Sequence, residues 1–311
     1  MMTPMDLRER IEQRVGEFLL FALTPPRLTT PPQRRQQIAD ATLERLRPIA
    51  PDGLVVYDID DEADRNPDDR PFPFLPTMDP VEYLATNLSA WASPVVVYRA
   101  VGKHAESTLT SWLGSVDPQQ VLSVFVGASS REKKMATPLP RAQELRLRVR
   151  PDLLMGGVAI PERHVRRNDE HMRLITKQDK GCSFFVTQVV YDVNAAKNLV
   201  SDYHDACRGR DVAAVPLVFT FSVCGSTKTL EFLRWLGVCV PRWLQAELER
   251  AGDMLEASFV HAVANAIELA RYCRRLGVPF GFNVESVSIR AAEIDASVRL
   301  AARLKEELDQ A

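Results

Sequence analysis

Four carboxylates follow the apolar segment Leu54–Tyr57 in close succession: Asp58, Asp60, Asp61 and Glu62. Crowding of like charges raises the pKa of one member of such a group, which makes it a candidate general acid. Oxygen ligands at alternate positions also suit a hard cation. The alternative interpretation is a solvated acidic loop, since the Pro- and Asp-rich sequence continues to Pro76 without an apolar run.

A side-chain amide occurs near the end of the apolar segment Phe184–Val190, at Gln188. Burying an amide without hydrogen-bond partners is costly. Its donor and acceptor together suit the edge of a pterin or a similar heterocycle. A structural Gln188, bonded to neighbouring loops, is the alternative.

Two further segments end in polar residues. Gly127 and Ser129 begin a turn rich in hydroxyl and basic residues after Leu122–Val126, and such a turn suits a phosphate or carboxylate group. Asn283 and Glu285 lie at the end of the last apolar segment. An ordinary loop explains the first pair equally well, and a helix cap explains the second.

His164 and His171 lie seven residues apart in a polar helical segment. No carboxylate or thiol in that segment completes a zinc site, so we expect both side chains to be exposed and predict no metal. The sequence also contains no P-loop, nucleophile elbow or HExxH motif.

The elements that would position these residues alternate along the chain. Short apolar or β-branched runs, each followed by a helix-period segment, are typical of parallel strands covered on both faces. The predicted strands are Phe18–Leu23, Leu54–Tyr57, Val95–Tyr98, Leu122–Val126, Leu154–Ala159, Phe184–Val190, Leu217–Phe221 and Phe280–Val284.

Eight such repeats predict an α/β fold, a (β/α)8 TIM barrel formed by residues 1–311 as a single domain. An N-terminal helix starting at Thr3 and Pro4, a long loop at Asp58–Pro76 after strand two, and a last helix with an apolar stripe complete it. Active sites of such barrels lie at the carboxyl ends of the strands, where the polar residues above occur. An open doubly wound sheet is the alternative, but no GxGxxG follows the first strand.

Composition restricts the classes of partner. The 311 residues carry a net charge of −2, which does not indicate nucleic-acid or anionic-membrane binding. Five scattered cysteines suit a reducing compartment, and no apolar run reaches the length of a membrane helix. We therefore predict a cytoplasmic protein with a small-molecule ligand; the sequence leaves the oligomeric state open.

The segment from Met172 to Asp192, MRLITKQDKGCSFFVTQVVYD, resembles a characteristic block of the methylenetetrahydrofolate reductase family. The Pro-Pro-Arg at Pro25–Arg27 and the GVCVPRW turn at Gly237–Trp243 extend the resemblance. It implies that Gln188 contacts the pterin of a folate and that Lys177 contacts a flavin. It further implies an NAD(P)H-dependent oxidoreductase of one-carbon metabolism that reduces 5,10-methylenetetrahydrofolate.

The chain departs from that family at several acidic and flavin-side positions. Ala22 stands where the family has a catalytic Glu, and Gly127 and Ala128 stand in its Arg-Gly-Asp run. The family's histidines correspond to Tyr98 and Ile160. These changes predict weak FAD binding or none, which leaves direct hydride transfer from NADH or NADPH.

A reductase lacking that Glu needs a substitute acid. Asp58 ranks first because it lies nearest a strand end, ahead of Asp60, Glu162 and Glu285. Tyr98 or Phe221 would stack on the pterin. Two alternatives remain open: a folate-binding protein without reductase activity that acts as a partner or regulator of methyl transfer, and a barrel enzyme for another heterocycle.

Overall fold

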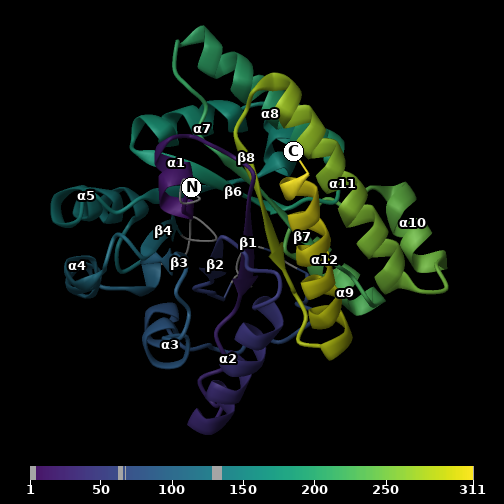
Figure 1. The fold of residues 1–311 in the computed structure, drawn as a ribbon, viewed down its shortest axis with the longest axis horizontal. Helices are drawn as coiled ribbons and strands as arrows, with labels where there is room; N and C mark the ends of the chain where they lie inside the picture. The colour runs from purple at the N-terminus through teal and green to yellow at the C-terminus, as the bar shows by residue number, and fades with distance from the viewer. Residues whose placement is uncertain (1–4, 62–65, 67, 128–134, 311) are drawn as a thin grey trace. The chain divides into compact units, whose positions relative to one another are not determined.

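Eight strands form a closed barrel in chain order, β1 to β8, and Figure 1 labels the strands other than β5. The predicted α/β barrel class is therefore confirmed. Each strand matches its predicted segment to within two residues. Their bounds are β1 Phe18–Leu23, β2 Gly53–Val56, β3 Val95–Ala100, β4 Val121–Val126, β5 Met155–Ala159, β6 Cys182–Val189, β7 Leu217–Ser222 and β8 Phe280–Glu285.

The strands are buried on both sides, as their apolar sequences require. β2 and β3 are buried along their whole lengths and pair in parallel register from Leu54 with Val95 to Val56 with Val97. β7 and β8 pair in parallel over six successive residues, from Leu217 with Phe280 onward. Val, Leu and Phe occupy many positions of these four strands, and β-branched and aromatic side chains in particular pack well on a pleated sheet.

Helices follow the strands, and side-chain oxygens cap several of them. Asp6 forms a capping box with Glu9 at the first helix, and Asp79, Asp192 and Asp253 cap three others. The helices are α1 Leu7–Glu12, α2 Pro32–Leu46, α3 Pro80–Asn87, α4 Glu106–Ser115, α5 Leu139–Val149, α6 Pro161–Arg167, α7 Glu170–Asp179, α8 Val193–Gly209, α9 Thr227–Trp235, α10 Arg242–Arg250, α11 Met254–Leu276 and α12 Ala291–Asp309.

The two terminal helices differ from prediction in detail. The described α1 begins at Leu7 with Asp6 as its cap, later than predicted, and the predicted start at Thr3 and Pro4 lies outside the described residues. In α12, Ala301 and Leu304 of the apolar stripe are buried, whereas Ile294 of the same stripe is only half-buried. α12 packs beside α11 (Figure 1), and the face of α12 that contacts α11 and β8 is the buried one.

The computed structural model describes residues 5–61, 66, 68–127 and 135–310. The chain forms two compact units, Ala22–Gly156 and the combination of Met1–Phe21 with Gly157–Ala311. Among the described residues, no helix is long and apolar enough to span a membrane.

Candidate functional site

An irregularity in β6 determines how Gln188 is presented. Val186 of β6 pairs with Val218 of β7, but Val189 pairs with Thr220, so β6 carries one extra residue between these pairs. The backbone N–H of Thr220 donates instead to the hydroxyl of Thr187 at 2.9 Å. Such bulges redirect side chains and occur often beside binding sites.

The amide of Gln188 is half-buried and held by two hydrogen bonds. Its Nε2 donates to the carbonyl of Leu236 at 3.1 Å, and its Oε1 accepts from the backbone N–H of Val189 at 3.1 Å. These partners determine which end of the amide is oxygen. A carboxamide has two N–H groups and two acceptor lone pairs, so one donor and one acceptor remain for a ligand.

The turn that receives Gln188 joins α9 to α10. Gly237 has a φ of 89°, a left-handed conformation that favours glycine at this position. Val238 anchors the turn in a buried cluster that includes Val189 and Leu244. Two residues beyond Gly237, the backbone N–H of Cys239 donates to Oε1 of Glu162 at 3.3 Å.

Glu162 lies in the first turn of α6, directly after β5, and is 8% exposed. Its Oε2 is buried and has no hydrogen-bond partner among the described residues. Burial raises the pKa of Glu162 to about 7, and the nearby Asp192 adds to the rise despite the opposing effects of Cys239 N–H and Arg166. Glu162 is therefore a carboxylic acid that can hold a proton near neutral pH.

Gln188 and Glu162 bond to the same turn from two different strand ends. We call Gln188, Glu162 and the turn Leu236–Cys239 the Gln188–Glu162 site. It combines a free amide edge with a protonatable carboxyl group, which suits recognition of a nitrogen heterocycle. Gln188 could be predicted from its position at the end of an apolar segment. Glu162 was ranked below Asp58 as a substitute acid because the burial of Glu162 cannot be read from the sequence.

Asp58 has the opposite environment. Its carboxylate accepts hydrogen bonds from the backbone N–H of Ala100 at 2.8 Å and from Nζ of Lys103 at 2.5 Å, and it lies 3.0 Å from Nε2 of His104. Burial raises the pKa of Asp58, but the bonds from His104, Lys103 and Ala100 outweigh burial and lower the pKa below its usual value. The ionised form is favoured, so Asp58 suits charge pairing better than the predicted role of substitute acid.

The same group includes a buried cation. Nη1 of Arg99 donates to both carboxylate oxygens of Asp79 at 2.8 Å, and its guanidinium lies over the ring of Trp112 at 5.2 Å. Nη2 of Arg99 also lies 3.4 Å from Nδ1 of His104. These contacts compensate a charge that is only 2% exposed. Sequence reasoning missed His104 and Lys103 because nothing in their spacing links them to Asp58.

We expect Asp58→Asn to lower the free energy of unfolding by about 1.5–3 kcal/mol, because the change removes the charged acceptor of the hydrogen bonds from Ala100 and Lys103. Urea denaturation at neutral pH measures the effect, with the exposed Asp61→Asn as a control that should change stability by less than about 0.5 kcal/mol. Because the folded pKa is lowered, this stabilisation is present above the unfolded pKa of about 3.9 and is lost as pH falls through the folded value. An unchanged acid unfolding profile in Asp58→Asn would contradict this role.

The two predicted stacking residues are largely enclosed. Tyr98 is 8% exposed and packs edge-on against Tyr57 with ring centroids 4.8 Å apart. Phe221 is fully buried and packs edge-on against Phe282 at 5.5 Å. In this arrangement both rings contribute to packing, and stacking on a pterin stays a prediction.

The two polar residues predicted on β8 lie at different depths. Asn283 is fully buried, and its Nδ2 donates to the hydroxyl of Thr220 at 3.2 Å across the β7–β8 pair. Glu285 is half-buried at the last position of β8. Asn283 therefore has a structural partner on β7, and contact of either residue with a ligand stays a prediction.

The structure describes two of the three residues predicted to contact a cofactor, Lys177 and Gly127. The ammonium of Lys177 donates to the carbonyl of Val158 on β5, and burial lowers its pKa. Gly127 faces the side chain of Leu139, whereas Ser129 lies outside the described residues. In this arrangement the ammonium of Lys177 is engaged by Val158, and its contact with a flavin stays a prediction.

One expectation about histidine is wrong. His164 is buried, with its side chain 2% exposed, rather than solvent-exposed. Its partner is Asp202, a residue of α8 that lies 38 positions further along the chain. The expectation of exposure was wrong because the partner, Asp202, lies on another helix, and no spacing in the sequence links it to His164.

The closed barrel, with a polar site at the ends of β5 and β6, defines a (β/α)8-barrel protein. The model of the methylenetetrahydrofolate reductase family matches residues 133–282. No curated protein matches the chain.

Solved structures extend the comparison to the whole chain. An uncharacterized protein from Clostridium thermocellum, described as binding two copies of 5-methyl-5,6,7,8-tetrahydrofolic acid, is 39% identical, with a TM-score of 0.86 over 96% of this chain and 99% of that one. A GH113 β-1,4-mannanase shares the fold alone, at 10% identity and a TM-score of 0.53 over 94% of this chain and 99% of that one. The chain belongs to the methylenetetrahydrofolate reductase family.

Proposed function

We propose that this protein binds a reduced folate of the 5-methyltetrahydrofolate type and that Gln188 recognises its pterin. The observation that carries the proposal is the fixed amide of Gln188, which retains one donor and one acceptor after bonding to Leu236 and Val189. A pterin presents a lactam N–H and a carbonyl side by side, which matches this pair. The folate-binding relative at 39% identity supports the same ligand class.

Glu162 provides a second polar group that could form a hydrogen bond with the folate. Its Oε2 is buried without a partner in the described part of the chain, and its pKa is about 7. An unsatisfied buried oxygen is unfavourable, and a ring nitrogen or amino group of the ligand would satisfy it. The bond between Cys239 and Glu162 holds this carboxyl next to the turn that Gln188 contacts.

Thermal unfolding with and without 5-methyltetrahydrofolate tests the proposal. A ligand at about 100 times its Kd stabilises the folded state by about 2.7 kcal/mol, so the unfolding temperature should rise with folate concentration. The control ligand is p-aminobenzoylglutamate, which lacks the pterin and should produce little shift. An equal shift with both compounds, or none with either, contradicts pterin recognition.

A second candidate function is reduction of 5,10-methylenetetrahydrofolate to 5-methyltetrahydrofolate. The protonatable Glu162 favours it, because the family's catalytic Glu is replaced by Ala22 and a proton donor is still required. Glu162 would give its proton to N10 as the bond from N10 to the methylene carbon breaks. NADH or NADPH would supply the hydride to that carbon and leave as the oxidised nucleotide. The alternative is a folate-binding protein that does not catalyse this reduction.

A further inference from the structure

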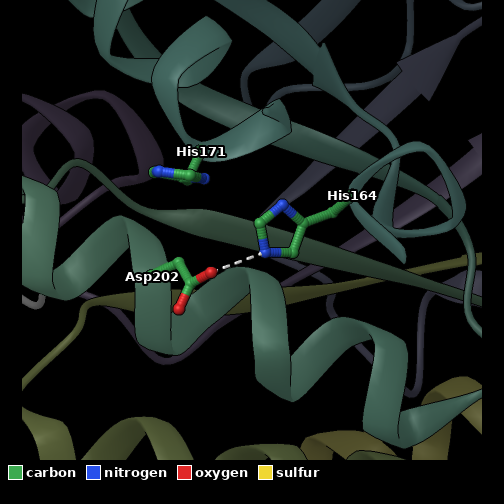
Figure 2. Close-up of side chains that lie close together, drawn as sticks. All are labelled: His164, His171 and Asp202. Carbon is green, nitrogen blue, oxygen red and sulfur yellow. Dashed lines mark hydrogen bonds and ion pairs between the residues drawn. The ribbon is translucent and has the colours of Figure 1, made fainter. Parts of the chain in front are cut away.

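Three side chains that are not part of the Gln188–Glu162 site converge from three helices. Figure 2 shows His164 of α6, His171 of α7 and Asp202 of α8 pointing toward one another. One possible metal-binding atom of each lies within 4.8 Å of the others. Nε2 of His164 is 3.0 Å from Oδ2 of Asp202, and the two imidazole rings are 5.2 Å apart, edge to face.

Each histidine also carries a buried nitrogen that the protein does not satisfy. Nδ1 of His164 and Nδ1 of His171 are both enclosed without a hydrogen-bond partner in the described ranges. His164 is 2% exposed, so water does not reach this ring freely. In the described ranges the protein therefore leaves one nitrogen of each imidazole without a partner, while Nε2 of His164 and Oδ2 of Asp202 face each other.

We propose that His164, His171 and Asp202 bind a zinc ion. Two imidazoles and one carboxylate are a usual set of three protein ligands for Zn²⁺, with a water molecule in the fourth tetrahedral position. Zinc–ligand bonds of about 2.0–2.1 Å place tetrahedral ligand atoms about 3.3 Å apart. The 3.0 Å separation of His164 and Asp202 needs almost no change, and His171 needs a small side-chain movement to close the site.

The local backbone brings the ligands together without strain in the helices. Asn168, in a left-handed conformation with a φ of 51°, ends α6 and reverses the chain before α7 begins. α8 packs against both helices and supplies Asp202. Glu170, which precedes His171 in the sequence, is already bonded to Arg163 at 2.9 Å and to the backbone N–H of Ile160.

A zinc ion at this position would tie α6, α7 and α8 together. α6 carries Glu162 in its first turn, and Asp192 caps α8. The ion would therefore fix the helix that positions Glu162 without contacting that residue. This effect on the helices is independent of which folate reaction the protein performs.

Metal binding by the full chain tests this site. Isothermal titration with Zn²⁺, followed by dialysis and metal analysis, should give one ion per chain. His171→Ala and Asp202→Asn should each weaken zinc binding by at least about tenfold, since loss of even outer-shell partners weakens metal sites to that extent. The controls are His204→Ala, on α8 but outside the cluster, and Cys239→Ser, which removes an exposed thiol; both should bind zinc as the unchanged protein does.

Cobalt gives an independent readout. Co²⁺ in a tetrahedral site absorbs visible light strongly, and these bands should appear in the unchanged protein and vanish in His171→Ala. Circular dichroism confirms that the variants are folded. Absence of stoichiometric zinc binding would overturn the proposal, as would binding that both ligand variants retain or that Cys239→Ser abolishes.

Discussion

Replacing Gln188 with alanine is expected to weaken the binding of 5-methyltetrahydrofolate by about 10- to 100-fold. The pterin would lose its donor–acceptor partner and leave its own lactam groups unsatisfied, which costs about 1–3 kcal/mol. Isothermal titration at constant pH measures the Kd. Because the bond from Gln188 to Leu236 is lost at the same time, the free energy of unfolding is measured on the same preparation.

Two comparisons separate recognition from a general loss of structure. Gln119→Ala removes an exposed amide from the turn before β4 and should leave the Kd unchanged. Gln188→Glu keeps the size of the side chain but removes its N–H donors, so it should bind folate nearly as weakly as the alanine variant. A folded Gln188→Ala protein with an unchanged Kd would refute the assignment of Gln188 to the pterin.

Glu162→Gln is expected to lower the rate of methylenetetrahydrofolate reduction by about 100- to 10,000-fold, the usual contribution of a general acid. Glutamine matches the shape of the side chain, and its Oε1 can still accept the hydrogen bond from Cys239. The Kd for 5-methyltetrahydrofolate should therefore change only a few-fold. Folate-dependent oxidation of NADH and of NADPH measures the rate, and the absorption spectrum shows whether a flavin is present.

The pH profile distinguishes a proton donor from a residue that only shapes the site. With a pKa of about 7, Glu162 is protonated below that value, so the rate should fall as pH rises through about 7. Glu162→Gln should lose this dependence. A variant that turns over at the original rate with the original profile would remove Glu162 from the reaction. Absence of folate-dependent NADH or NADPH oxidation by the unchanged protein would instead leave a folate-binding protein without turnover.

The free energy of unfolding should also fall as pH rises, because the pKa of Glu162 is higher in the folded protein than in the unfolded chain. The folded pKa of about 7 lies above the unfolded value of about 4.3, so folding is favoured by the protonated acid. This contribution is complete below about pH 4.3, declines between the two values and is lost once pH has risen through about 7. Glu162→Gln should remove that decline, which urea denaturation at several pH values can detect.

The strands and the family could be predicted from sequence because their signals are local. The runs at Val95–Ala100 and Leu217–Ser222 are apolar and β-branched, and the block from Met172 to Asp192 is contiguous. Gln188 could be found for the same reason, since an amide at the end of such a strand is conspicuous.

The remaining site features depend on contacts between distant segments. The bulge of β6 exists only relative to β7, and the turn at Leu236 reaches Gln188 across 48 positions. Asp58 was predicted to be a general acid, but His104 and Lys103 contact its carboxylate and favour the ionised form. Likewise, His171 and His164 lacked a carboxylate until α8 placed Asp202 next to them.

A crystal structure of the protein with 5-methyltetrahydrofolate tests the central claim most directly. We predict that the lactam edge of the pterin lies within about 2.7–3.2 Å of the Gln188 amide, with Glu162 beside the same ligand. A folate bound without contact to Gln188, or failure of the protein to bind any reduced folate at saturating concentration, would contradict the proposed function.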